Sequence, residues 1–169
     1  EYDVVIIGGG PIGSIASLLL EAKGLSVALI ERNTVPYPFP RAIALNGFSM
    51  GLVKDLIGPE LWSEFEFTPG IHVGYVLNKD KMDEPFGLMQ PPVIEGKILD
   101  NDSFGFLNWF NQPQLEGLLR RSIEDRGGIT TLYGHEALVL WEDDLNFVRV
   151  QELSTGESFD ISGKYLLGA

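Results

Sequence analysis

The sequence predicts an α/β fold built on a parallel β-sheet, and three observations indicate it. The chain begins with a β-branched apolar run at residues 2–7, which is typical of a strand buried on both faces. The glycine-rich turn GGGPIG follows at once, and a second apolar run occupies residues 25–30. Apolar residues at helical spacing lie between the two runs. Strand, helix and strand within about thirty residues form a βαβ unit, whose crossover is almost always right-handed.

The composition suits a globular domain and argues against several kinds of partner. The 169 residues include 12 Lys and Arg against 24 Asp and Glu, a net charge of −12, which disfavours nucleic acid and anionic membrane surfaces. The sequence has no cysteine, and its two histidines, His72 and His135, are too far apart for a metal-binding spacing, so no metal site is expected. It shows neither a membrane-spanning apolar run nor a signal peptide, so the expected location is cytoplasmic.

Turn and cap signals place the next elements. Pro11 suits the first turn of the first helix, and Gly24 is the predicted C-cap. Residues 32–45 contain three prolines and are predicted to form an extended loop. Asn46 is the predicted cap of a helix that runs through Ser49 to Leu56.

The rest of the chain alternates between strand-like and helical patterns. Roughly residues 68–110 mix strand-like runs with prolines, which predicts an excursion of antiparallel strands outside the parallel sheet. Gln112 and the proline after it open another helix, which a glycine pair stops at Gly127. Residues 129–161 then predict a strand and a β-meander, and residues 164–169 predict one more buried strand.

Gly8, Gly10 and Gly13 form the G-x-G-x-x-G pattern of a Rossmann-like dinucleotide site, and Glu31 ends the second strand. The first glycine permits the tight turn, the second lets a diphosphate approach the backbone, and the third lets the helix pack on the sheet. The helix N-terminus offers unpaired N–H groups to the phosphates. A carboxylate at the end of the second strand accepts hydrogen bonds from ribose hydroxyls and repels a 2′-phosphate, which disfavours NADP. The predicted contacts are Gly8, Gly10, Pro11, Ile12, Gly13 and Glu31.

This fingerprint predicts an adenine dinucleotide but does not separate FAD from NAD, and a glycine-rich turn in an unrelated α/β protein remains an alternative. Further segments resemble the FAD-dependent aromatic hydroxylases. They are DVVIIGGGPIG with ALIERN, PRAIALN at 40–46, FLNWFNQPQLEGLLR at 106–120 and KYLLGA at 164–169. The resemblance is to the para-hydroxybenzoate-hydroxylase-like single-component flavoprotein monooxygenases, and it is closest to their phenol and hydroxyphenylpropionate hydroxylase branch.

The resemblance implies an FAD-binding domain of the glutathione-reductase type, with a β-meander and an antiparallel excursion. It implies an enzyme that uses NAD(P)H as a transient reductant and O₂ to hydroxylate a small phenolic substrate. In this family the counterpart of Arg41 contacts FAD, that of Gln112 lies beside the ribityl chain, and that of Arg32 lines the adenosine. Ala137 is expected near the adenine. A solvated loop arginine is the alternative for Arg41, and a helix-capping role is the alternative for Gln112.

Family members are much longer than this chain, so residues 1–169 are expected to be the N-terminal portion of an FAD-binding domain, without the later FAD motifs and the substrate domain. Catalytic residues and oligomeric state are left unassigned. Arg120 and Arg121 lie beyond the first turn of their helix and are predicted to be surface charge. Two other functions stay open, namely an NAD-dependent dehydrogenase and a non-enzymatic protein with a flavoprotein-like fold.

Overall fold

The computed structural model describes two compact units of the chain. The described residues are 1–39, 41–70, 74–76, 87–89, 93–94, 97–98 and 107–169. The first unit contains residues 1–41, 56–65 and 112–169, and the second contains residues 42–55 and 66–111.

The first unit is built on a mixed sheet that confirms the predicted βαβ start. Its strands are β1 (Tyr2–Ile7), β2 (Val27–Glu31), β10 (Ile129–Tyr133), β11 (His135–Glu142), β12 (Asn146–Glu152) and β13 (Ser158–Gly168). The six strands lie in the order β10-β2-β1-β13-β12-β11. The pairs β10–β2, β2–β1 and β1–β13 are parallel, whereas β13–β12 and β12–β11 are antiparallel and form the predicted meander.

β13 joins two segments that the sequence analysis separated. The last meander strand and the C-terminal strand are one 11-residue strand. Gly163, in its middle, pairs with Asn146 of β12 on the antiparallel side and with Tyr2 of β1 on the parallel side. One strand therefore connects the meander to the parallel sheet.

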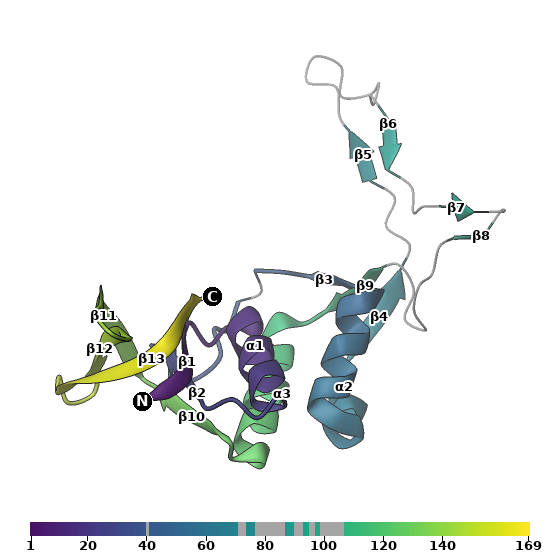
Figure 1. The fold of residues 1–169 in the computed structure, drawn as a ribbon. Coiled ribbons are helices and arrows are strands. Elements are labelled where there is room, and N and C mark those ends of the chain that lie inside the picture. The colour runs from purple at the N-terminus through teal and green to yellow at the C-terminus, as the bar shows by residue number, and fades with distance from the viewer. Residues whose placement is uncertain (40, 71–73, 77–86, 90–92, 95–96, 99–106) are drawn as a thin grey trace. The chain divides into compact units, whose positions relative to one another are not determined.

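Two helices cover one face of the parallel strands (Figure 1). They are α1 (Pro11–Glu21) and α3 (Gln112–Arg126), which pack against each other. Leu18 of α1 and Leu119 and Ile123 of α3 are buried completely or almost so. An ion pair of 3.1 Å between Arg126 and Glu21 joins the two helices near their C-terminal ends.

The meander covers the opposite face. Val5, Ala28 and Ile30 of the parallel strands form a buried cluster with Val148 and Val150 of β12. Because successive side chains of a strand point to opposite faces, β1 and β2 contribute to both layers of the core. This double burial explains why both strands are continuously apolar in sequence.

The ends of two helices test the cap predictions. α1 ends at Glu21 with Ala22 as its C-cap, so the predicted cap, Gly24, lies two residues further on. Gly24 nevertheless takes a left-handed φ of 80°, which glycine adopts without strain. Asn46 caps the next helix as predicted, since its Oδ1 accepts a 2.8 Å hydrogen bond from the Ser49 N–H.

That next helix, α2 (Gly47–Glu64), is longer than predicted because it combines two helical segments. They meet at Gly58, whose φ of 78° and ψ of 170° are not helical, and Pro59 follows it. In the first unit, the carbonyl oxygen of Leu56 accepts hydrogen bonds from Ser122 and Arg126 of α3, at 3.3 and 2.6 Å. These contacts satisfy a carbonyl that the interrupted helix cannot use.

The second unit contains the antiparallel excursion that the sequence predicts. Its strands are β3 (Ala44–Asn46), β4 (Phe67–Gly70), β5 (Gly74–Val76), β6 (Gly87–Met89), β7 (Val93–Ile94), β8 (Lys97–Ile98) and β9 (Leu107–Phe110). A three-stranded sheet has the order β3-β9-β4, and β5–β6 and β7–β8 are antiparallel pairs. His72 lies outside the described residues.

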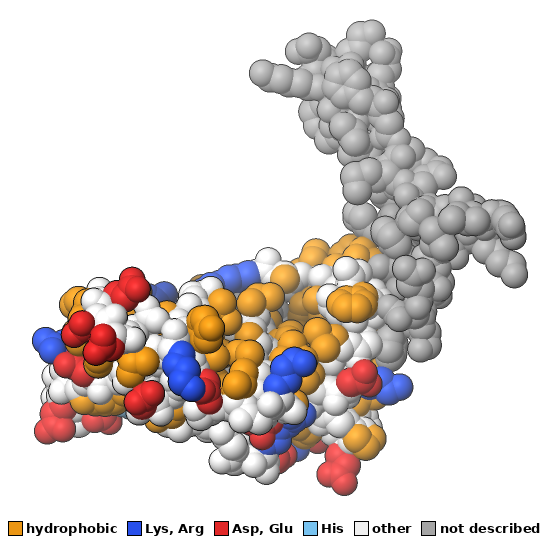
Figure 2. All heavy atoms as spheres, in the orientation of Figure 1, with side chains coloured by type: hydrophobic (Ala, Val, Ile, Leu, Met, Phe, Trp, Pro, Cys, Tyr) orange, Lys and Arg blue, Asp and Glu red, His pale blue; other side chains and the backbone are white. Residues whose placement is uncertain are grey.

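Charge is unevenly distributed over the first unit. Figure 2 shows acidic side chains gathered over the end that holds β11, β12 and β13. The exposed acidic residues there include Glu142, Asp143, Asp144 and Glu157. Among the described residues, no helix is both long enough and apolar enough to cross a membrane.

Candidate cofactor site

The turn between β1 and α1 is closed by contacts that only glycine allows. Gly8 continues the strand by donating its N–H to the Ile30 carbonyl at 2.8 Å, and its φ is 110°. A Cβ on Gly8 would collide with the carbonyl oxygen of Ala169, and a Cβ on Gly13 would collide with the carbonyl oxygen of Gly8. The first and third glycines of the motif are therefore required by the packing of the protein itself.

Gly10 has different surroundings. Its φ of −69° and ψ of −172° are open to any residue, so no left-handed conformation requires glycine here. Within the part of the chain that the structure describes, a Cβ on Gly10 would have no neighbouring atom within 4 Å. The missing side chain leaves open space directly in front of the first turn of α1.

The N-terminus of α1 lacks a side-chain cap. Gly10 is the N-cap and supplies no side-chain hydrogen bond, and Pro11 at the first helical position has no N–H. The first turn has no acidic residue, and the Ser14 N–H donates to the Gly10 carbonyl at 3.0 Å. The N–H groups of Ile12 and Gly13 therefore remain available to an anion, together with the positive end of the helix dipole.

Glu31 lies against this glycine turn. Its Oε2 accepts a 2.7 Å hydrogen bond from the Gly9 N–H. Its Oε1 accepts hydrogen bonds from the backbone N–H and the side-chain Nδ2 of Asn33, at 2.8 and 2.7 Å. A Cβ on Gly9 would stand 2.7 Å from the Glu31 Cβ, so this glycine also makes room for the acid. The structure thus brings together the predicted turn and the predicted acid.

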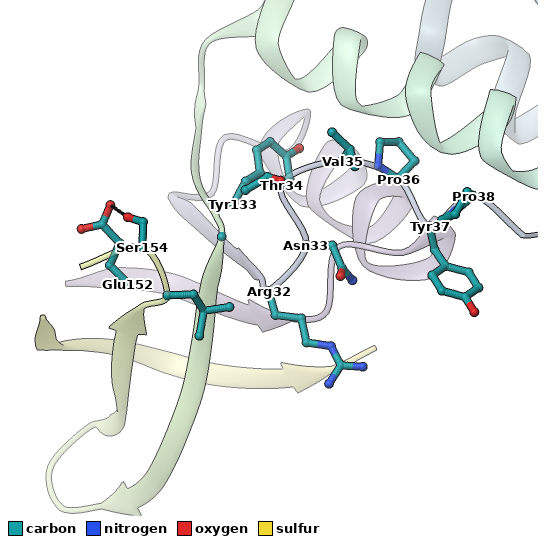
Figure 3. A pocket seen from close by; sticks show the side chains of 12 residues that line it. Arg32, Asn33, Thr34, Val35, Pro36, Tyr37, Pro38, Tyr133, Glu152 and Ser154 are labelled. Carbon is teal, nitrogen blue, oxygen red and sulfur yellow. Dashed lines mark hydrogen bonds between the residues drawn. The ribbon is translucent and has the colours of Figure 1, made fainter. Parts of the chain in front are cut away.

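A hollow of about 370 Å³ opens beside the loop that follows Glu31 (Figure 3). Three segments form its walls: residues 32–38, the turn at Tyr133 and Gly134, and the hairpin between β12 and β13. The hairpin contributes Glu152 and Ser154, joined by a 2.9 Å hydrogen bond from the serine hydroxyl to Glu152 Oε1. Arg32, predicted to line an adenosine, is one of the lining residues.

Gln112 and Arg41 are connected, but through the arginine backbone. Gln112 is buried at the start of α3, and its Oε1 accepts a 2.9 Å hydrogen bond from the Arg41 N–H. Its Nε2 donates to Oε1 of Glu116 at 2.7 Å. The Arg41 guanidinium lies over the Tyr37 ring, 4.8 Å from its centroid. Gln112 therefore fixes the end of the loop, and the Arg41 side chain is exposed.

Ala137 is placed in β11, where the register with β12 shifts between Ala137 and Val139. It is partly buried and packs against the core cluster of the meander face. It is not among the residues that line the hollow described above.

Arg120 is buried, so the prediction that it is a surface charge is wrong. Its exposed fraction is 7%, and its guanidinium donates to the carbonyl oxygens of Thr34 and Asn33 at 2.9 and 3.4 Å. It also lies over the Tyr133 ring, 4.3 Å from the centroid. Gln112, Glu116 and Arg120 recur at i, i+4 spacing on one face of α3, but only the structure shows that this polar face is buried.

The neighbouring Arg121 is a surface charge, as predicted. It is half exposed and forms a two-bond ion pair with Glu64, at 2.6 and 3.0 Å. The Tyr133 hydroxyl, by contrast, is buried and has no hydrogen-bond partner among the described residues. Burial raises the pKa of Tyr133; Arg120 opposes that rise, whereas Glu124 and Glu31 add to it.

The chain is similar to known proteins over its whole length. The family described as "FAD binding domain" matches residues 1–169. The chain is 27% identical to 3-(3-hydroxy-phenyl)propionate/3-hydroxycinnamic acid hydroxylase 1 of Burkholderia vietnamiensis, over 100% of the chain and 26% of that protein. It is 30% identical to a probable NADH-specific resorcinol 4-hydroxylase of Rhodococcus jostii, over 98% of the chain and 30% of that protein.

A solved structure has a similar fold. The flavin-dependent monooxygenase PieE, in complex with FAD and substrate, superposes with a TM-score of 0.76 at 25% identity. The match covers 99% of this chain and 30% of PieE. The chain thus spans 26% to 30% of the length of these relatives.

Proposed function

Because the chain belongs to the FAD binding domain family, within the flavin-dependent aromatic hydroxylases, we propose that it binds FAD for an enzyme that hydroxylates a small phenolic substrate. NAD(P)H is the proposed transient reductant and O₂ the oxygen donor. In this proposal, residues 1–169 are the N-terminal portion of the FAD-binding domain, and the catalytic residues are unassigned.

The observation that carries the proposal is the open space at Gly10. Gly8 and Gly13 are glycines because the protein fills the space around them, whereas no atom of the described residues fills the space at Gly10. That space lies at the uncapped N-terminus of α1, where backbone N–H groups and the helix dipole favour an anion. The residues therefore fit a diphosphate, with Ile12 and Gly13 as the backbone donors.

Glu31 is suited to hold the neighbouring ribose. A carboxylate has about four lone-pair sites, and the described hydrogen bonds from Gly9 and Asn33 occupy three of them. Oε2 has a single described donor and can accept a further hydrogen bond from a ribose hydroxyl. Its negative charge would repel a 2′-phosphate, which favours FAD or NAD over NADP at this site.

The remaining predicted FAD contacts lie outside the glycine turn and Glu31. Arg32 follows Glu31 and lines the hollow, so it is the proposed neighbour of the adenosine, with Ala137 near the adenine. Arg41 is the proposed contact to the diphosphate or an adjoining ribose, and Gln112 is the proposed neighbour of the ribityl chain. Gln112 orients the Arg41 backbone, and the planar guanidinium of Arg41 is suited to a diphosphate or a ribose.

Bound FAD would supply the redox and oxygen-transfer chemistry, as cofactors do in such enzymes. The residues of this chain bind it and orient it. This division explains why the candidate site contains glycines, backbone N–H groups and one carboxylate rather than an acid–base pair.

The absorption spectrum of the purified full-length protein tests the proposal. FAD gives a visible flavin spectrum, whereas bound NAD absorbs no visible light, so a colourless protein that binds NAD would favour the dehydrogenase. Glu31→Lys should lower flavin content and affinity by removing the ribose acceptor. Unchanged flavin affinity in that variant would show that the adenosine is placed wrongly.

A second measurement separates an enzyme from a non-enzymatic binder. We expect the flavin-loaded protein to consume O₂ when NAD(P)H and a phenolic compound are added, and to form a hydroxylated product. Flavin binding without oxygen uptake across a range of phenols would favour the binding protein.

A further inference from the structure

Arg120 is a buried cation, and its surroundings indicate what it holds in place. Removing a guanidinium from water is costly unless hydrogen bonds compensate. Among the described residues, the two terminal nitrogens of Arg120 obtain them from backbone carbonyls, those of Asn33 and Thr34, rather than from a carboxylate, and its Nε has no partner. Its planar group also lies over the Tyr133 ring, an arrangement that favours a cation. The arginine therefore fixes the backbone of the loop, and not another charged side chain.

The same loop residue holds the acid. Asn33, whose carbonyl accepts from Arg120, donates both its backbone N–H and its Nδ2 to Glu31 Oε1. Glu31 Oε2 in turn accepts from the Gly9 N–H in the glycine turn. A continuous series of hydrogen bonds thus runs from Arg120 through Asn33 and Glu31 to the turn at Gly9.

The loop is also constrained on its other side. Gly134 has a left-handed φ of 73°, and a Cβ there would stand 3.0 Å from the Thr34 methyl group. Thr34 is therefore packed against the backbone of the turn between β10 and β11, while Arg120 binds its carbonyl. Both contacts restrict the backbone directly after Asn33.

From this arrangement we propose that Arg120 is a positioning residue for the cofactor site. By fixing the Asn33–Thr34 backbone, it holds the Glu31 carboxylate against the glycine turn, in the orientation in which Glu31 accepts the ribose hydroxyls. This inference depends on the proposed function for the role of Glu31. The hydrogen-bonded series itself does not depend on it.

Affinity for FAD in the full-length protein, stripped of flavin, tests the proposal. Arg120→Met removes the donors while keeping a long side chain, and Arg121→Met is the matched control on the adjacent, exposed arginine. We expect Arg120→Met to raise the FAD dissociation constant about tenfold, the size of one or two lost charged hydrogen bonds. Arg121→Met should leave it within about twofold.

A double-mutant cycle distinguishes positioning from a general loss of structure. If Arg120 acts through Glu31, Glu31→Gln should weaken FAD binding by itself, and adding Arg120→Met should then change it by no more than about twofold. An undiminished effect of Arg120→Met in the Glu31→Gln background would overturn the proposal. Arg120→Lys keeps the positive charge but loses the planar guanidinium that donates to two carbonyls. If Arg120→Met does not fold, Arg120→Lys replaces it in the double-mutant cycle with Glu31→Gln.

Hydrogen exchange of the flavin-free protein gives an independent result. Arg120→Met should speed exchange of the Asn33 and Gly9 amides, whereas Arg121→Met should not. Unchanged protection of both amides would refute the positioning role. The two proposals can fail separately. If these amides exchange faster in Arg120→Met but the native protein does not bind FAD, the proposed function fails and the positioning of Glu31 by Arg120 stands.

Discussion

Gly10 and Gly13 lie three residues apart in one turn, yet their missing side chains face different surroundings. At Gly13 the space is occupied by the carbonyl oxygen of Gly8, so the protein itself requires glycine. At Gly10 none of the described residues has an atom within 4 Å of the site of a Cβ, and the backbone conformation is open to any residue. At the scale of single residues, folding and binding are therefore separable within one motif.

Gly10→Ala should mainly weaken FAD binding, whereas Gly13→Ala should mainly lower the stability of the fold. Gly10→Ala should cost about 1 kcal/mol or less in the free energy of unfolding, because alanine fits the backbone and meets no protein atom. It should weaken FAD binding at least about tenfold by filling the space proposed for the diphosphate. Gly13→Ala should destabilise the fold by about 3 kcal/mol, since the backbone must move.

Urea denaturation of the flavin-free protein and fluorescence titration with FAD measure the two effects separately. Equal loss of stability in both variants would show that Gly10 also serves the fold. Full FAD affinity in Gly10→Ala would place the diphosphate elsewhere.

Three strands are tied together at one end of the sheet by a single carboxylate. Asp3 of β1 accepts hydrogen bonds from the backbone N–H and hydroxyl of Ser26, just before β2, at 2.9 and 2.7 Å. It also accepts a 2.7 Å hydrogen bond from Lys164 of β13. The hydrogen bond from Lys164, followed by those from Ser26, lowers the pKa of Asp3 well below its usual value of 3.8. At the scale of elements, one ionised side chain thus links strands from both ends of the chain.

Asp3→Asn should change how stability depends on pH. A lowered folded-state pKa means that the contribution of Asp3 is fully present above its unfolded value of 3.8 and is lost as pH falls below it. The free-energy difference between native protein and variant should therefore be constant near neutral pH and shrink as acid is added. Denaturation midpoints at a series of pH values measure it. Asp144→Asn, in the exposed turn after β11, is the control and should show a smaller, flatter difference.

At the scale of elements, the sequence also shows where local patterns stop being sufficient. The apolar periodicities of β1, α1 and β2 predict these elements because each pattern reflects burial on known faces. The sequence predicts two segments where β13 is one strand, because nothing local shows that the strand pairs with β12 along its first half and with β1 along its second. Pairing over such distances depends on tertiary contacts.

For the molecule as a whole, ligand binding should appear as added stability. A ligand that binds only the folded state adds about 2.7 kcal/mol when its concentration is one hundred times its dissociation constant. We therefore expect FAD to raise the melting temperature of the flavin-free, full-length protein in calorimetry. NAD⁺ at the same concentration should raise it much less. An equal or larger shift with NAD⁺ would favour the dehydrogenase, and the Gly10→Ala variant should reduce the shift with FAD.

The sequence by itself determined the βαβ unit, the glycine turn and the acid at the end of β2, because all three depend on residues close together in the chain. Only the tertiary structure revealed that Arg120 is buried beneath the loop after Glu31 and that Gln112 holds the Arg41 backbone. These contacts join residues 86 and 71 positions apart. Whether a charged side chain is solvated or buried depends on which segment folds over it, and no local pattern contains that information.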